Sequence, residues 1–341
     1  MAQQHLEPTD PTARVTTGDA LAGYLRAQAT EFLRALRLHR ETGTVSATEE
    51  SVDAARALRR SARRISGSLH TFRPLLETDW SEEIRPELAW LSGTLGLEHA
   101  YEARLERLLL ALHRLSGSTS LPGQATSEAA TERGNLTVGA AKAGALLDRQ
   151  LTLARTRAHS TALQALGSSR FHAVADKVAV LASEVPLTAA APSTDLRPLA
   201  SAAEERLTDA IAALPLVTAG HPYNAEALVH GLSPDPAPHP QDGPWHQVRL
   251  LLRLHRYARE VLLRGVEAPV DVRLLAAGQA LNRHRDASEA AAAAASAART
   301  PRIAPATAYA LGVLHADQRH EVEAARFAFQ QAWQKQRVEA V

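Results

Sequence analysis

The stretch that decides the fold is PWHQVRLLLRLHRYARE, residues 244–260. Pro244 suits the first turn of a helix, and apolar residues such as Leu250 and Leu254 recur at helical spacing. A polar file runs beside them at steps of 3, 4, 3 and 4: His246, Arg249, Arg253, Arg256 and Glu260. The stretch therefore predicts an amphipathic helix that packs through its leucines and carries a basic strip about 20 Å long on its flank.

The rest of the chain has the same helical period. No window alternates at a period of two residues, so we expect an all-α protein with essentially no β-sheet. A first helix is predicted to begin near Thr17 or Asp19, and residues 114–135, rich in Ser, Thr and Gly, are predicted to form a loop. Further helices are predicted at about 47–73, 84–115, 136–166, 170–184, 196–214, 245–264, 270–283, 285–299 and 305–338. The alanine run at 290–298 is typical of a small-residue packing helix.

An internal repeat indicates two halves. Residues 56–70, RALRRSARRISGSLH, align with residues 246–260 and place Arg56 on His246 and Arg59 on Arg249. We therefore predict a disordered tail over residues 1–16, a first helical bundle over 17–190 and a second over 191–341.

Composition excludes several classes of protein. The 341 residues carry a net charge of only +1, which argues against a generally basic nucleic-acid coat, so an anion site must be a local concentration of charge. The chain has no cysteine, which excludes disulfides, thiolate nucleophiles and zinc ribbons. No apolar run approaches the length of a membrane span, and the first residues lack the apolar segment of a signal peptide. We expect a cytoplasmic protein.

The rows of arginines in these predicted helices need negative charges nearby. Like charges three or four residues apart destabilise a helix by about 0.2–0.5 kcal/mol per pair, and residues 52–75 hold six arginines against one acid. Acids on neighbouring helices could supply the counter-charge, which would give a helical scaffold with internally paired arginines. An anionic ligand could also supply it, because guanidinium groups bind phosphate oxygens in pairs.

Two pairs of segments carry a resemblance to a known family. RALRRSARRISGSLHTFRPLL at 56–76 is followed by IRPELAWLSGTLGLEHAYEARLERL at 84–108, and WHQVRLLLRLHRYARE at 245–260 is followed by LNRHRDASEAA at 281–291. Together they resemble the CHAD domain over about residues 19–335. The resemblance implies two antiparallel helical bundles related by a pseudo-twofold axis, with a basic groove between them.

The resemblance also implies function. CHAD domains bind inorganic polyphosphate and associate with polyphosphate granules, without catalysis by the domain itself. We therefore expect no catalytic residue, no cofactor and no metal site, with inorganic polyphosphate as the partner and the granule as a location. The predicted polyphosphate-binding residues are His246, Arg249, Arg253, Arg256, Tyr257 and Arg285, with Arg56, Arg59, Arg63, Arg64 and Arg73. The sequence leaves open whether the protein forms a homodimer and whether nucleic acid competes weakly with polyphosphate for the site.

This chain departs from the family pattern in its first half. Arg56 stands where the family has a histidine, Ser66 replaces an arginine, and residues 99–102 replace an Arg-Asp run. The second-half site should therefore resemble the family more closely than the first. Tyr257 could serve in core packing instead of binding. A metal-dependent phosphohydrolase remains as an alternative function.

Overall fold

The computed structural model describes residues 17–42, 49–117, 127–221, 239–263 and 271–334, and the predicted tail over 1–16 lies outside them. The described residues form helices and contain no β-strand, which confirms the all-α class; one isolated bridge joins Leu76 and Leu187. The helices are α1 (Gly18–Thr42), α2 (Glu49–Thr71), α3 (Thr78–Leu115), α4 (Ser127–Leu166), α5 (Ser169–Ser183), α6 (Arg197–Ala212), α7 (Leu216–Ala219), α9 (Gly243–Leu262), α10 (Val272–Ala298) and α11 (Pro305–Gln334). Three short 3₁₀ turns are η2 (Arg73–Leu75), η3 (Ala191–Ser193) and η4 (Pro240–Asp242).

The chain divides into two compact units. Unit 1 comprises residues 1–95, 164–207 and 253–269, and unit 2 comprises 96–163, 208–252 and 270–341. Each unit draws on both sides of the boundary that we predict between residues 190 and 191. That boundary, and the pseudo-symmetric bundles with a basic groove, stay predictions.

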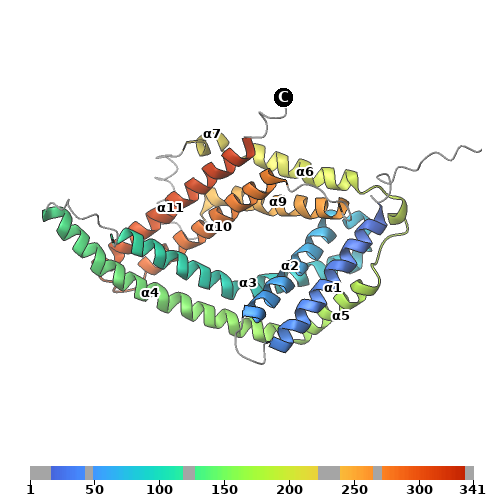
Figure 1. Cartoon of the computed structure of the whole chain (residues 1–341), viewed down its shortest axis with the longest axis horizontal. Coiled ribbons are helices and arrows are strands. Elements are labelled where there is room, and N and C mark those ends of the chain that lie inside the picture. Colours follow the sequence, from blue (N-terminus) through green and yellow to red (C-terminus); the bar gives the residue numbers. More distant parts are fainter. Residues whose placement is uncertain (1–16, 43–48, 118–126, 222–238, 264–270, 335–341) are drawn as a thin grey trace, which may run out of the picture. The chain divides into compact units, whose positions relative to one another are not determined.

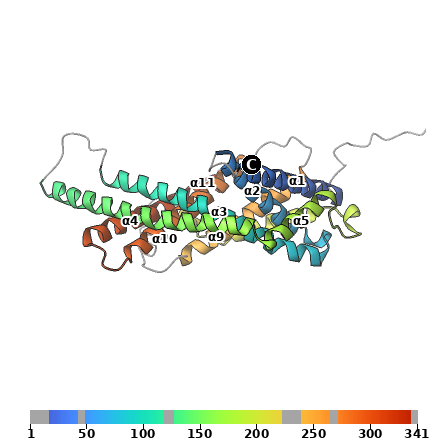
Figure 2. The same cartoon turned by 90° about the horizontal axis from the view of Figure 1, so that it is seen from below.

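Unit 1 is built around helices α1, α2 and α5. Helix α1 packs along α2 and α5, as the views in Figures 1 and 2 agree. Their apolar faces meet in a core that includes fully buried Leu25, Phe32, Leu58 and Phe171, and the last turns of α9 add Ala258 and Val261 to it. Removing these side chains from water stabilises the unit and fixes where the end of α9 lies against α2.

Unit 2 is built around the long contact between α10 and α11, which lie side by side (Figures 1 and 2). The alanines of α10 allow this approach, because Ala290, Ala294 and Ala297 are fully buried in the core with Leu311 and Leu314 of α11. The prediction of a small-residue packing helix at 290–298 is confirmed.

Two predicted boundaries were wrong. Helix α10 runs without a break from Val272 to Ala298, whereas we predicted separate helices at 270–283 and 285–299. His284 and Ser288, which lie at and after the predicted break, are buried in unit 2 on the interior face of the helix. Helix α4 begins at Ser127, inside the predicted loop, because residues 127–133 are rich in good helix formers such as Ala, Glu and Arg.

Helix α9 contributes its first ten residues to unit 2 and its last ten to unit 1. Its buried residues include Trp245, Val248 and Ala258, as an amphipathic helix requires. Leu250 is an exception, since 45% of it is exposed, so its assignment to the packing face was wrong. Val248 and Leu252 face the interior two residues to either side of it.

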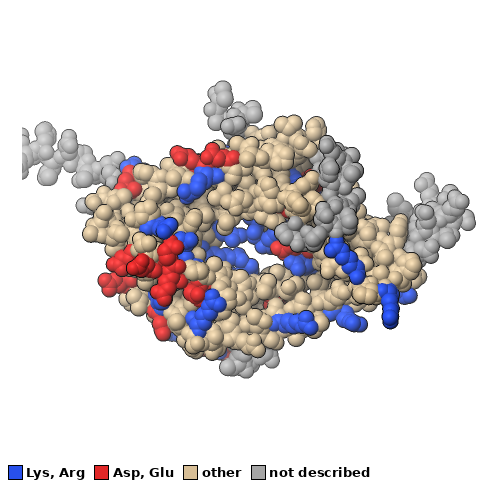
Figure 3. Space-filling model, turned by 180° about the vertical axis from the view of Figure 1, so that it is seen from behind, with Lys and Arg blue, Asp and Glu red and all other residues tan. Residues whose placement is uncertain are grey.

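The surface carries charges of both signs. Figure 3 shows acidic and basic side chains intermingled on part of one face, in keeping with a net charge of +1. Among the described helices, none combines the length and apolar character that crossing a membrane requires.

Candidate functional site

In unit 1, Arg64 of α2 forms an ion pair with Glu260 in the last turn of α9. The Arg64 guanidinium donates from Nε to Glu260 Oε2 at 2.8 Å and from Nη2 to Oε1 at 3.4 Å. The hydroxyl of Tyr24 on α1 donates to the same Oε2 at 2.8 Å, and Arg256 Nε lies 3.6 Å from Oε1. Burial raises the pKa of Tyr24, and the adjacent carboxylate raises it further. Glu260 therefore supplies the counter-charge for Arg64 and ties three helices together.

Tyr257 lies beside this cluster and packs into the core. Only 4% of the residue is exposed, and a Cβ built on Gly67 of α2 would stand 2.6 Å from its ring. The glycine thus permits the close approach of α2 and α9. The ring is used for packing, and a binding role for Tyr257 stays a prediction.

The other predicted arginines of unit 1 have varied surroundings. Arg59 Nε donates to the carbonyl oxygen of Ser92 at 3.1 Å, and Arg56 forms an exposed ion pair with Asp53 at 3.1 Å. Arg63 and Arg253 are half-buried, and Arg73 lies on η2 beyond the end of α2. Helix α2 and the second half of α9 therefore concentrate basic groups in unit 1, and some of these groups are also internally paired.

In unit 2, three predicted residues gather at the start of α9 and the middle of α10. Arg249 Nε donates to Asn282 Oδ1 at 2.9 Å, and Arg285 Nε donates to Asp286 Oδ1 at 2.9 Å. Burial lowers the pKa of His246, and nearby Arg249 and Arg285 act in the same direction. The Nε2 atom of His246 is buried and has no hydrogen-bond partner among the described residues. His246 thus lies near two guanidinium groups, of which that of Arg285 is also paired with Asp286.

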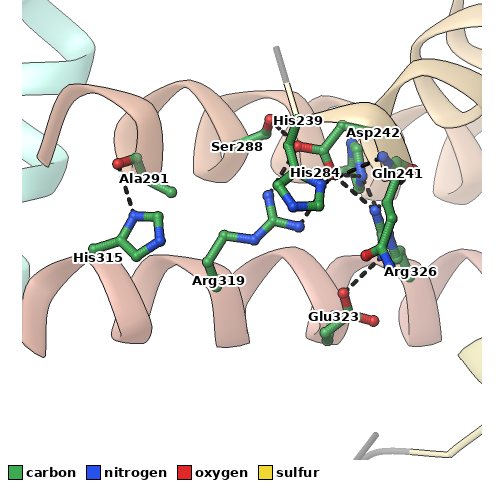
Figure 4. Close-up of polar contacts among 10 residues, drawn as sticks. All are labelled: His239, Gln241, Asp242, His284, Ser288, Ala291, His315, Arg319, Glu323 and Arg326. Atoms are coloured by element: carbon green, nitrogen blue, oxygen red, sulfur yellow. Dashed lines mark hydrogen bonds and ion pairs between the residues drawn. The ribbon is translucent and has the colours of Figure 1, made fainter. Parts of the chain in front are cut away.

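A buried polar cluster surrounds Asp242, which ends η4 directly before α9 (Figure 4). Asp242 is fully buried, and its Oδ2 accepts from Ser288 Oγ at 2.5 Å and from Arg319 Nη1 at 2.8 Å. Its Oδ1 accepts from Arg326 Nη2 at 2.7 Å. Two side chains of α11 and one of α10 thus hold the first turn of α9.

The Asp242 cluster balances its own charge. Arg326 Nη1 donates to Glu323 Oε1 at 2.7 Å, so two buried carboxylates meet two buried guanidiniums. His284 stacks on Trp245 with ring centroids 5.6 Å apart and lies edge-on to His246 at 5.4 Å. The cluster therefore serves to position α9, and through it His246 and Arg249, because buried charges that satisfy one another have little left to offer a ligand.

The stability of unit 2 should fall as the pH drops from about 6.5 towards 4. Burial lowers the pKa of His284 to about 4 from its ordinary 6.5, so in this range the unfolded chain binds a proton that the folded chain does not. Burial alone would raise the pKa of Asp242, but the polar groups around its carboxylate, His284, Arg319 and Ser288, outweigh it and hold that pKa below its ordinary value. Its contribution is lost only at still lower pH. Urea unfolding between pH 7 and 4.5 measures the loss, which should reach up to about 3 kcal/mol.

The matched control for this pH effect is His284→Gln, which removes the titrating group. The variant should lose stability less steeply than the wild type over the same range. A wild-type stability that stays constant from pH 6.5 to 4.5 would contradict the assignment to buried His284.

Sequence reasoning missed the acid and both arginines of this cluster. Asp242 stands at the end of a proline-rich connection that gave no sign of burial. A signal for the arginines did exist. Arg319 and Arg326 are seven residues apart and interleave with Val322 and Phe329 on the apolar face of α11, which predicts that they are buried.

Two histidines of α11 that could suggest a metal are used in hydrogen bonds. His315 Nδ1 lies 3.0 Å from the carbonyl oxygen of Ala291 (Figure 4), and His320 Nδ1 lies 2.8 Å from that of Ala316. Among the described residues, no three His, Asp or Glu side chains are grouped as a metal ion would require.

The chain is similar to a known protein family and to a solved structure. A family model described as the CHAD domain matches residues 27–271, a range that contains all of α2 and α9. The solved structure of PptA from Streptomyces chartreusis is 75% identical in sequence, with a TM-score of 0.79, and the match covers 94% of this chain and 100% of that one. A search of curated proteins gave no match.

Proposed function

Because the chain belongs to the CHAD family, we propose that it binds inorganic polyphosphate and does not catalyse a reaction on it. The observation that carries the proposal is that the matched range includes α2 and α9, the two helices with arginine files. Arginine suits this ligand because its planar fork pairs with phosphate oxygens and stays charged at physiological pH.

The proposed contacts divide between the two units. In unit 1 they are Arg59, Arg63 and Arg253, with the more exposed Arg56 and Arg256. In unit 2 they are His246, Arg249 and Arg285. Arg64 is bound to Glu260, and we assign it mainly to holding α2 against α9.

The internal pairs favour the scaffold alternative for some arginines only. Arg64 and the two arginines around Asp242 are matched by buried or half-buried acids, and they stabilise the fold. Arg59 donates to a carbonyl oxygen and Arg249 to an amide oxygen, and such contacts orient a guanidinium group. We therefore assign some arginines to stabilising the fold and others to binding polyphosphate.

Absence of catalysis is part of the proposal. The buried carboxylates of Asp242 and Glu323 are both engaged by guanidinium groups, so neither is placed to act as a general base. Association with polyphosphate granules follows from the same binding and is proposed with it.

A binding and release experiment tests the proposed function. The full chain is titrated into fluorescently end-labelled polyphosphate of about 100 units, and inorganic phosphate is measured after hours of incubation with Mg²⁺ or Mn²⁺. We expect saturable micromolar binding, weaker displacement by single-stranded DNA of equal charge, and no phosphate release. Metal-dependent release would favour a phosphohydrolase, and absence of saturable binding would refute the proposal.

A further inference from the structure

Unit 1 contains a second group of basic residues, separate from the row of arginines on α2. A pocket of about 320 Å³ opens where the end of α2, η2, the first turns of α3 and helix α6 meet. Its lining includes His70, Arg73, Glu82, Arg85, Leu199 and Arg206. Of these basic residues, the sequence analysis predicted a binding role only for Arg73, and Arg206 on α6 is far from it in the sequence.

The charges of this pocket are unequal. Glu82 is the one carboxylate among its lining residues, and both Arg73 and Arg85 share it, with Nε and Nη1 lying 2.9 Å and 3.1 Å from Oε1. Arg206 makes no ion pair with any residue in the described part of the chain. Three guanidiniums therefore face one carboxylate, which leaves a net charge of about +2 in a small concave space.

The three arginines of the pocket all act on the imidazole of His70. Burial lowers the pKa of His70, and Arg85, Arg206 and Arg73 lower it further, while Glu82 acts in the opposite direction. Cations from η2, α3 and α6 thus act on the same ring. An anion placed among them would offset their repulsion of the imidazolium form.

We propose that this pocket binds one phosphate-group oxyanion through Arg73, Arg85 and Arg206. Guanidinium donors from three elements suit a tetrahedral oxyanion, and charge-assisted hydrogen bonds are the stronger kind. Pro74, Leu199 and Ala202 supply the apolar part of the pocket lining. The ligand is either free inorganic phosphate or the end group of a polyphosphate chain. The inference does not depend on long-chain binding by α2 and α9.

The test follows the imidazole resonance of His70 in the full chain by NMR, assigned with His70→Asn. Addition of orthophosphate should shift the resonance saturably and raise the pKa of His70. Arg206→Gln should weaken the response at least fivefold. The matched control is Arg197→Gln, because Arg197 lies on the same helix, is 70% exposed in its side chain and pairs with Asp195 outside the pocket. It should respond like the wild type.

Two arms separate the sources of the phosphate group. Tripolyphosphate acting at lower concentration than orthophosphate assigns the pocket to chain ends, and orthophosphate acting alone assigns it to the free ion. If neither ligand shifts His70, or if the response survives Arg206→Gln unchanged, the proposal is wrong. A His70 response without binding of 100-unit chains would reject the proposed function and leave this pocket standing.

Discussion

Asp242→Ala should lower the free energy of unfolding of unit 2 by about 3–5 kcal/mol. The change leaves Arg319 and Arg326 in the interior without their shared carboxylate, and an uncompensated buried charge is among the most costly defects in a protein. In a unit of this size the loss corresponds to a fall in Tm of about 6–20 °C. Urea and thermal unfolding followed by circular dichroism measure it.

Two further variants sharpen this test. Asp286→Ala removes a carboxylate whose side chain is 45% exposed and which pairs with Arg285 on the same helix, so it should cost less than about 1 kcal/mol. Combining Asp242→Ala with Arg319→Leu, Arg326→Met and Glu323→Gln removes both stranded guanidiniums and the carboxylate that pairs with Arg326, and it should recover much of the loss. If Asp242→Ala costs no more than Asp286→Ala, Asp242 does not anchor α9.

Reversing two charges on α9, with Arg249→Glu and Arg253→Glu, should weaken polyphosphate binding at least about fivefold. Each exposed contact is worth about 0.2–1 kcal/mol, and a reversal both removes an attraction and adds a repulsion. Two reversals therefore amount to about 1–4 kcal/mol, and each 1.4 kcal/mol is a factor of ten in Kd. Titration of end-labelled polyphosphate with the variant measures the effect.

The control for this reversal has the same net charge. Arg34→Glu with Arg197→Glu changes two arginines whose side chains are 71% and 70% exposed and which pair with neighbouring acids. It should change the Kd by less than about threefold. Equal weakening in both double variants would mean that net charge alone governs binding and that the arginines of α9 have no special part.

The helical fold was predictable because it depends on local periodicity. The leucines and alanines of α9 and α10 recur at helical steps, and the alanine run packs as its composition indicates. The break predicted within α10 failed for a tertiary reason. His284 and Ser288 are buried in one continuous helix because they contact Asp242, which is 42 and 46 residues away in the chain.

The candidate site was predictable only in part. The sequence places arginines on one side of α2 and α9, but it cannot show which of them meet an acid. Glu260 reads as the last member of the basic file, and only the packing of α9 shows that it serves Arg64 and Tyr24, 196 and 236 residues earlier. The pocket around His70 was hidden for the same reason, since η2, α3 and α6 supply its arginines separately.

The salt dependence of polyphosphate binding tests the central claim most directly. If the arginines of α2 and α9 bind the chain, log Kd should rise steeply with log salt concentration, by close to one unit of slope for each phosphate contact. The Arg249→Glu, Arg253→Glu variant should have a slope smaller by about two, and the Arg34→Glu, Arg197→Glu control should keep the wild-type slope. A wild-type slope near zero, or an unchanged slope in the α9 variant, would contradict the claim.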